Sequence, residues 1–356
     1  MSNPSRNLNI DVLKCVAALM VIVIHVFNAT QGAETIAPFV MSITSWGVPY
    51  FFIASGFFFG SKNREFSLAP VTSTILRLTA IYITAIAFYF ALDINVFANN
   101  DATFSIKFLL SGQPSARHLW FLLAMIFGYG VLCAASTMAG KITLMIASGC
   151  LVLIGLATNP YPILYEALGT TGQRILMLLF PHFLSIPFIY FGFWIARSQA
   201  QQKMKTAHTV VLMIAGAVLA TAEAVVAYSH GIISQFYFGT YVLAAGVFLF
   251  SLSAPSFRGG VARALAMIGL RFSLPIYVYH LCILNEFSLL LGDDREMPVI
   301  YKILLNSAFL FVTLAAVFAM LGRVSKKFIQ LIDGSAALRV IEKAIDFFQR
   351  KLQYGR

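Results

Sequence analysis

Charged residues are scarce in this chain. They make up 11% of the 356 residues, whereas apolar residues make up 59%. Soluble globular domains carry about 25% charged and about 45–50% apolar residues. The composition therefore excludes an ordinary soluble domain and indicates an integral membrane protein.

Cysteines are also few, and each is isolated within an apolar run. A disulfide framework or a cysteine-based metal site needs these residues at characteristic spacings. We therefore predict neither a disulfide scaffold nor a bound metal. We interpret the four cysteines as small packing residues: Cys15, Cys133, Cys150 and Cys282.

Acidic residues are the rarer charge, with 14 Asp and Glu against 25 Lys and Arg. An excess of basic residues indicates nucleic-acid binding when they gather in one patch or stripe. Here they are scattered between apolar runs. We therefore expect no nucleic-acid partner and interpret the basic residues as signals of membrane topology.

Long apolar runs are what the chain has in quantity. A helix needs about 20 apolar residues to cross about 30 Å of hydrocarbon. The runs predict an all-α, polytopic membrane protein with about ten transmembrane helices. Counts of nine or eleven stay open, because the fifth run is short and follows the fourth after a tight turn. The predicted spans are residues 8–28, 40–60, 74–92, 119–138, 142–157, 175–196, 208–228, 233–252, 273–291 and 299–321.

The basic residues then orient these spans. Lys and Arg are enriched in the cytoplasmic loops of membrane proteins. If the N-terminus is cytoplasmic, only five of the 25 Lys and Arg residues lie on the outer side of the membrane. With ten spans, both termini are therefore predicted to be cytoplasmic. A cleaved signal peptide is the alternative for the first run, but the lysine within that run and the nine spans after it favour a retained helix. The outer basic residues are Lys107, Arg117, Arg174, Arg295 and Lys302.

The tail, residues 323–356, differs from the membrane domain predicted over residues 1–322. Its apolar residues recur at helical spacing, and charged residues occupy the other faces. This pattern predicts an amphipathic helix that lies on the cytoplasmic leaflet, in contact with membrane lipids. It would serve as an anchor or a dimer contact, so a homo-oligomer is open. The apolar positions are Leu338, Ile341, Ile345, Phe348 and Leu352.

The first predicted span carries a polar stripe. Ionisable groups in hydrocarbon are costly unless they face a bundle interior or a water-filled cavity, and there they commonly mark a functional site. The alternative is that the two charges sit in the headgroup zone and the histidine only packs. At about 100° per residue, one helix face holds Asp11, Lys14, Ala18, Val21, His25 and Asn28.

The stripe links the two sides of the membrane. Lys14 and His25 are 11 residues apart, or about 16 Å along a helix axis. Lys14, Arg77 and Arg271 at an inner mouth can hold the phosphates of a large anionic donor. A neutral histidine deeper in can take a proton from a hydroxyl. A proton-coupled transporter or glycan exporter would use similar residues, whereas a membrane scaffold leaves the stripe without a purpose.

Five features of the sequence combine into a family pattern. They are residues 9–14 (NIDVLK) with the apolar run that follows, residues 47–57 (GVPYFFIASGF), Arg77, residues 118–122 (HLWFL) and residues 273–280 (SLPIYVYH). Together they resemble the acyltransferase-3 family of bacterial integral-membrane O-acyltransferases. The resemblance covers the chain to about residue 322. It implies acetyl transfer from cytosolic acetyl-CoA to a cell-envelope glycan, by a multi-pass protein of the bacterial inner membrane.

The resemblance also implies roles for residues of the donor side. His25 would be the catalytic histidine, either as general base or as an acyl-accepting nucleophile. Lys14 and Arg77 would bind the phosphates of CoA, with Asp11 holding Lys14 in place. Ser55 would hydrogen-bond the thioester oxygen, or bond its own backbone and ease helix packing. Acetyl-CoA is a co-substrate here, and no bound cofactor is expected. Two departures from the family pattern fall in this region, Lys14 in place of the more frequent arginine and Cys15 in place of glycine.

On the acceptor side, Arg117, His118 and Trp120 would line the mouth, with Trp120 either stacking on a sugar or serving as an interfacial belt residue. Tyr277 and His280 would orient the acceptor or the catalytic histidine. The partner would be an envelope polysaccharide or a lipid-linked sugar. Two polar residues match no family motif, and we predict that both are buried and hydrogen-bonded: His182 and Glu223.

Overall fold

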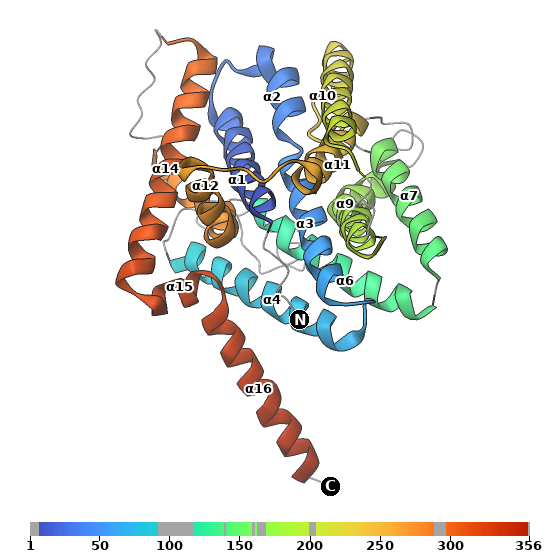
Figure 1. Ribbon diagram of the computed structural model, residues 1–356, viewed down its shortest axis with the longest axis vertical. Coiled ribbons are helices and arrows are strands. Elements are labelled where there is room, and N and C mark those ends of the chain that lie inside the picture. The colour runs from blue at the N-terminus through green and yellow to red at the C-terminus, as the bar shows by residue number, and fades with distance from the viewer. Residues whose placement is uncertain are drawn as a thin grey trace.

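The computed structural model describes residues 7–91, 117–138, 140–158, 161, 169–198, 204–287 and 297–354, and these ranges contain helices and no strands. Figure 1 shows their arrangement. The elements are α1 (Leu8–Ala29), η1 (Glu34–Ile36), α2 (Ala37–Thr44), α3 (Gly47–Lys62), α4 (Leu68–Ala91), η2 (Arg117–Leu119), α6 (Trp120–Met138), α7 (Lys141–Thr158), α9 (Gly169–Ser198), α10 (Thr206–Ser229), α11 (Phe238–Ser253), α12 (Gly260–Arg271), α13 (Ser273–Phe287), α14 (Val299–Val324), α15 (Lys326–Ile332) and α16 (Ser335–Tyr354).

The all-helical membrane fold is confirmed in its coarse form. Each of the ten predicted runs overlaps a helix. Among the described residues, five helical units are long and apolar enough to cross a membrane: α1, the η1–α3 unit, α4, α10 and α14. The α12–α13 pair makes a sixth if it counts as one bent span, and α6, α7 and α11 contain shorter apolar helices. Ten spans and cytoplasmic termini stay predictions.

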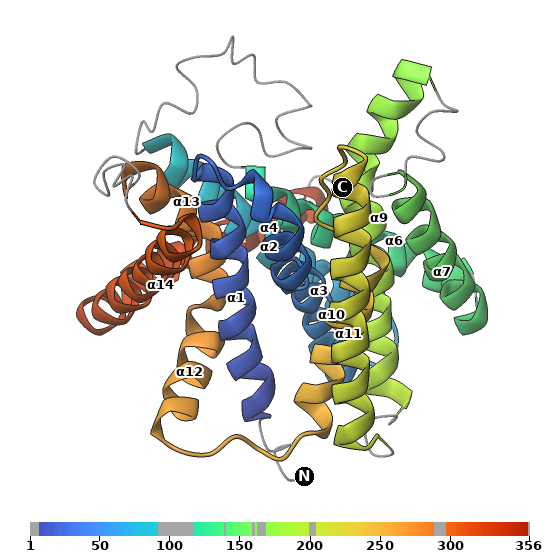
Figure 2. The ribbon, with the colours of Figure 1, turned by 90° about the horizontal axis from the view of Figure 1, so that it is seen from above.

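Helix α1 is the element around which the others are placed. It contacts α2, α3, α11, α12, α13 and α14, and Figure 2 shows it between α12 and α3. Its N-terminus is capped by Asn7, whose side chain accepts hydrogen bonds from two backbone N–H groups of the first turn. The polar stripe turns mostly inward, because Asp11 is buried and Lys14 and His25 are half-buried, whereas Asn28 is exposed.

A side chain at the start of α1 fastens this helix to the α11–α12 connection. The Asn9 amide donates to the carbonyls of Ala254 and Pro255, at 3.1 and 3.2 Å. Its oxygen accepts from the backbone N–H of Phe257 at 2.8 Å. The Asn7 amide donates to the carbonyl of Ser251. Asn7 and Asn9 thus supply hydrogen-bond partners for three backbone groups of this connection and for one backbone carbonyl near the end of α11.

Residues 260–271 form a helix that the predicted spans did not include. This helix, α12, packs closely against α1 and then bends by 77° into α13. The close approach depends on Gly269, since a Cβ atom there would lie 1.8 Å from the carbonyl oxygen of Asp11. A similar contact joins α3 and α9, where Gly56 meets the Ile189 carbonyl and Gly192 meets the Ile53 carbonyl.

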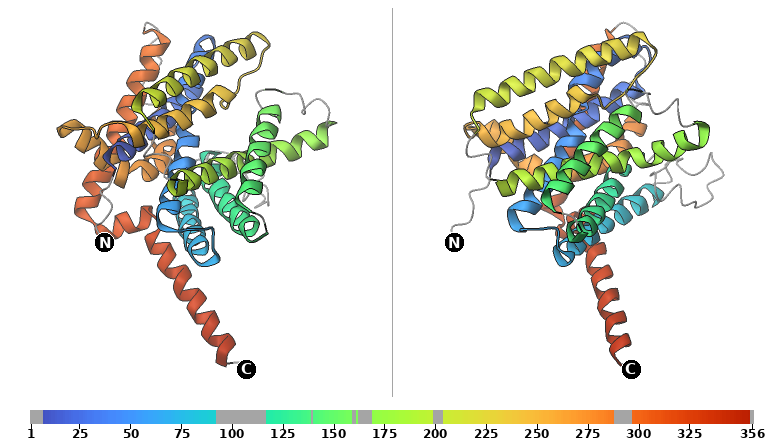
Figure 3. Two further views of the ribbon diagram at one scale, coloured as in Figure 1. Left: turned by 45° about the vertical axis from the view of Figure 1, so that its right-hand side comes forward. Right: turned by 90° about the vertical axis from the view of Figure 1, so that its right-hand side faces the viewer.

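The tail leaves the bundle crosswise. Helix α16 runs away from the other helices in Figure 1 and across the direction of α9, α10 and α11 in the right-hand view of Figure 3. Its beginning packs against α4. The predicted helix therefore exists, while its place on the cytoplasmic leaflet stays a prediction. Among the predicted outer residues, Lys107, Arg295 and the side chains of Arg117 and Arg174 lie outside the described part of the chain.

Candidate active site

Three histidines from separate parts of the chain meet inside the bundle. The ring centroid of His25 on α1 lies 4.8 Å from that of His280 on α13 and 6.2 Å from that of His118 in η2. The rings of His118 and His280 are 5.0 Å apart. His118 and His280 are fully buried, with 1% and 0% of their surface exposed. We call these three side chains the histidine cluster.

Backbone carbonyls fix the hydrogen positions on two of these rings. The Nε2 atom of His118 is 2.7 Å from the carbonyl oxygen of Val278, and the Nδ1 atom of His280 is 2.7 Å from that of Tyr277. Because a carbonyl only accepts, each of these nitrogens carries the hydrogen. The other nitrogens, Nδ1 of His118 and Nε2 of His280, are buried lone pairs with no partner within the described residues. The cluster therefore holds two acceptors next to His25.

Two tyrosines hold this arrangement in place. The Tyr277 hydroxyl donates to the carbonyl oxygen of His118 at 2.7 Å. The Tyr89 hydroxyl donates at 2.9 Å to the Val278 carbonyl, which also accepts from His118. All four residues are buried. The segments that carry His118 and His280 are thus joined by hydrogen bonds in both directions.

Replacing Tyr277 by phenylalanine should destabilise the protein by about 1–3 kcal/mol, because the buried carbonyl of His118 loses its hydroxyl partner. Thermal unfolding of the purified protein in detergent measures the change. Tyr301→Phe serves as the control, since the Tyr301 side chain is 61% exposed. Equal unfolding temperatures for the two variants would contradict the role assigned to the Tyr277 hydroxyl.

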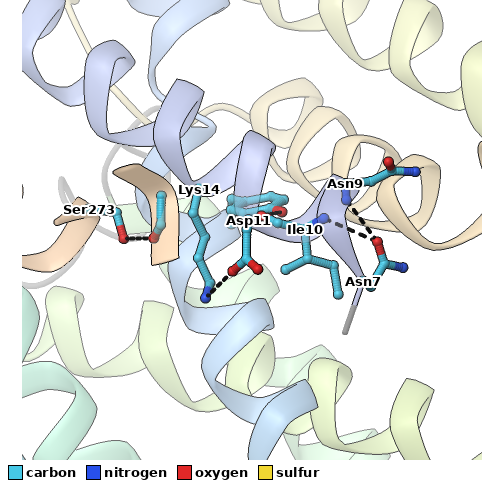
Figure 4. Close-up of polar contacts among 8 residues, drawn as sticks. Asn7, Asn9, Ile10, Asp11, Lys14 and Ser273 are labelled. Atoms are coloured by element: carbon cyan, nitrogen blue, oxygen red, sulfur yellow. Dashed lines mark hydrogen bonds and ion pairs between the residues drawn. The ribbon is translucent and has the colours of Figure 1, made fainter. Parts of the chain in front are cut away.

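The predicted contact between Asp11 and Lys14 is present. The Lys14 Nζ atom lies 3.2 Å from Oδ1 of Asp11, as Figure 4 shows. The same amine lies 4.5 Å from the centroid of the Phe58 ring on α3, within the range of a cation–π contact. The lysine is thereby held at the interface between α1 and α3.

One cavity is lined by this lysine, and a second cavity adjoins the first. The first, of about 410 Å³, is lined by Lys14, Ser55, Lys62 and Arg77 among others, and we call it the lysine cavity. The second, of about 680 Å³, holds four cationic side chains and is called the arginine cavity. Both are lined by Arg77, Ile81, Leu270 and Leu274. The cationic residues of the arginine cavity are Arg77, Arg271, Arg323 and Lys326.

Phe51, Phe121 and Tyr277 lie between the lysine cavity and the histidine cluster, and Val278 lies between the cluster and the arginine cavity. Phe51 and Phe121 line the lysine cavity, and their rings lie 6.1 and 5.0 Å from that of Tyr277. Val278 lines the arginine cavity, and its carbonyl holds His118. The histidines themselves line neither cavity. The sequence placed Lys14 and His25 on one face of one helix, and the structure adds the aromatic layer between them.

Ser55 lines the lysine cavity, and its hydroxyl is hydrogen-bonded to a side chain of a neighbouring helix. Its hydroxyl is 2.8 Å from that of Tyr129 on α6, rather than bonded to its own backbone. The backbone-bonding interpretation was therefore wrong, because a buried tyrosine hydroxyl from a neighbouring helix supplies the partner. Tyr129, which lines the same cavity, was not recognised from the sequence.

The remaining predicted residues are distributed around this site. Trp120 is half-buried and packs on Phe52 and Phe236, with ring centroids 6.3 and 6.4 Å apart. His182 is buried against Phe127, but its Nδ1 atom has no hydrogen-bond partner among the described residues. Glu223 is half-buried and accepts from the Gly239 N–H and the Tyr161 hydroxyl. The first bond joins α10 to the start of α11, and the second joins α10 to the residue Tyr161 that follows α7.

The histidine cluster has no sign of being a metal centre. The described residues contain no group of three or more His, Cys, Asp or Glu side chains arranged to hold a metal ion. All three rings belong to the cluster, yet no carboxylate or thiolate joins them. Imidazole groups can donate and accept protons, so the cluster is a candidate site for proton transfer.

Comparison with known proteins agrees with the motifs. Neither the curated proteins nor the solved structures gave a match to the chain. The family model described as an acyltransferase domain matches residues 7–323. The matched region includes α1 and the three histidines of the cluster. It also includes α4 and α12, whose residues line both cavities. The chain belongs to the acyltransferase-3 family.

Proposed function

We propose that the protein transfers an acetyl group from cytosolic acetyl-CoA to a hydroxyl of a cell-envelope glycan at the bacterial inner membrane. The family supports a membrane O-acyltransferase. The observation that carries the finer proposal is the position of His25, in an imidazole cluster that a few aromatic side chains separate from the lysine cavity and Val278 separates from the arginine cavity. A basic cavity suits an anionic donor, and an imidazole suits a hydroxyl acceptor.

His25 acts as the general base in this proposal. It takes the proton of the acceptor hydroxyl as the oxygen attacks the thioester carbonyl. The carbon–sulfur bond then breaks, and the leaving thiolate takes the proton from the imidazolium. The lone pairs on His118 and His280 favour this role, because a neighbouring acceptor stabilises a proton on His25. An acyl-histidine intermediate is the alternative, and trapping of a labelled acyl group in the absence of acceptor would establish it.

Lys14 and Arg77 bind the donor. Both line the lysine cavity, where Lys62 adds a third positive charge. Lysine contributes a point charge, whereas the guanidinium of Arg77 can hold a phosphate with two parallel hydrogen bonds. Asp11 keeps the Lys14 amine at the cavity wall. The role proposed for the Ser55 hydroxyl is a hydrogen bond to the thioester oxygen, and its place on the wall of the same cavity supports this role.

The acceptor approaches from the other end of α1. Asn28 is exposed one turn beyond His25, so the polar face opens there. Trp120 and Arg117 lie at the start of α6, in the same motif as His118. An aromatic ring and a guanidinium are suited to a sugar face and its hydroxyls. The acceptor class is an envelope polysaccharide or a lipid-linked sugar.

Mass spectrometry of envelope glycans tests the proposal. Cells that carry the gene should contain a glycan heavier by one acetyl unit per modified sugar than cells that lack it, and the difference should return on complementation. Purified protein should also release free CoA thiol from acetyl-CoA when the acceptor is present. An unchanged glycan profile together with altered solute uptake would instead support a transporter.

A further inference from the structure

The segment that follows the matched family region forms one wall of the arginine cavity. Lys326, Gln330, Ile332 and Asp333 all line this cavity. The family match ends at residue 323. Residues 326–334, which we call the strap, therefore add a wall from outside the matched region.

The strap is fastened to the membrane helices at two points. The Tyr279 hydroxyl on α13 donates to the carbonyl oxygen of Ile332 at 3.3 Å. Gly334, with φ +73°, lies so close to α4 that a Cβ atom would be 2.6 Å from the backbone nitrogen of Ile81. Both φ and the lack of space require glycine at this turn. Ile81 itself lines the arginine cavity, so the turn sits on the cavity's own wall.

The tail also positions the polar side chains of the strap. The Arg339 guanidinium on α16 donates to the Gln330 side-chain oxygen at 2.6 Å. One oxygen of Asp333 accepts from the backbone N–H of Ser335 at 2.9 Å, at the start of α16. Asp333 is the single carboxylate among the described residues that line the cavity. The strap and the first turns of α16 therefore form one hydrogen-bonded unit.

The charges in the cavity come from four different elements. Arg77 lies on α4, Arg271 at the end of α12, Arg323 on α14 and Lys326 on the strap. Within the described part of the chain, none of the four forms an ion pair with a carboxylate. Like charges repel unless an anion lies between them, and the one carboxylate of Asp333 does not balance four cations, so the cavity favours a ligand with several phosphate groups.

We propose that the strap closes the donor site and that Arg323 and Lys326 bind the phosphate groups at the nucleotide end of the acyl donor. This inference rests on the proposed acyl transfer from acetyl-CoA. It divides the donor between the two cavities. The thioester end lies in the lysine cavity near Ser55, and the phosphorylated end lies in the arginine cavity beneath the strap. Arg77 lines both and is placed between the two ends.

Two donors that differ in their phosphates test the assignment. Arg323→Gln combined with Lys326→Gln should raise the KM for acetyl-CoA about tenfold or more, with little change in kcat. The KM for S-acetylpantetheine, which has the same thioester and no phosphate, should not change. Lys327→Gln is the matched control, since Lys327 is the exposed neighbour of Lys326 on the same short helix and does not line the cavity. An equal rise for both donors, or no rise for either, would overturn the assignment.

A second variant moves the strap without removing a charge. Gly334→Val should also raise the KM for acetyl-CoA and spare that for S-acetylpantetheine, because the new side chain pushes the strap off α4. An unchanged KM for acetyl-CoA would contradict the closing role of the strap.

Direct binding separates this inference from the proposed function. Calorimetry with CoA alone needs no acceptor and no turnover. If the wild type binds CoA and the Arg323→Gln, Lys326→Gln protein binds it at least tenfold more weakly, the strap site is supported even if acetyl transfer fails. If both proteins bind CoA equally, the strap inference fails while acetyl transfer can still hold. If neither binds, the strap inference fails together with the donor assignment.

Discussion

Replacing His25 by asparagine should abolish acyl transfer while the protein remains folded and inserted. General acid–base catalysis by one side chain contributes about 10²–10⁴-fold to a rate, and a nucleophilic histidine would contribute at least as much. Asparagine keeps a polar group of moderate size among the other two rings but has no basic nitrogen. Release of free CoA thiol in the presence of acceptor measures the loss.

His230→Asn is the control for this variant. His230 is an exposed histidine at the C-terminal end of α10 and belongs to no cavity or cluster described above. It should retain full activity. Activity of His25→Asn within about tenfold of the wild type would contradict the general-base role. Residual but uncoupled solute flux in the His25 variant would favour the transporter.

Replacing Gly269 by valine should prevent α12 from packing on α1. A Cβ atom at this position would lie 1.8 Å from the carbonyl oxygen of Asp11 and 3.0 Å from the nitrogen of Cys15. Overpacking in a close-packed interior costs about 1–3 kcal/mol and occasionally more. The clash here is with backbone, which cannot move without displacing the first helix. We expect loss of most folded protein and of nearly all activity.

Size-exclusion chromatography and thermal unfolding in detergent measure this effect. Gly260→Val is the matched control, because Gly260 begins the same helix and has nothing within 4 Å of its added Cβ atom. The control should behave as the wild type does. Comparable stability of the two variants would show that α12 does not approach α1 as closely as described.

The sequence predicted those parts of the site that depend on one helix. Asp11, Lys14 and His25 share a face because helical periodicity fixes their relation, and an ion pair spaced three residues apart follows from it. The contact of His25 with His118 and His280 was harder to predict from the sequence. The family motifs marked both residues, but the ring contacts depend on how α1, η2 and α13 pack, which no local pattern encodes.

Two other features had weaker signals. Residues 260–271 are short for a span and contain Arg263 and Arg271. The predicted spans therefore left out this stretch, which forms a helix that packs on α1 through Gly269. The amphipathic pattern of the tail predicted a helix but said nothing of the preceding turn, where Gly334 brings the strap against α4. In both cases one glycine sets the packing, and a glycine in a sequence does not show which backbone it will meet.

The bonds from Asn9 to the α11–α12 connection have a consequence for biogenesis. Asn9 and its partner Ala254 are separated by 245 positions. At about 5–20 residues per second, a ribosome needs on the order of ten to fifty seconds to make the chain between them. During that interval the first helix lacks its later neighbours α11, α12, α13 and α14, which pack against it in the finished fold. The translocon, lipid headgroups or water must shelter the charges of Asp11 and Lys14 until the second half of the polypeptide arrives.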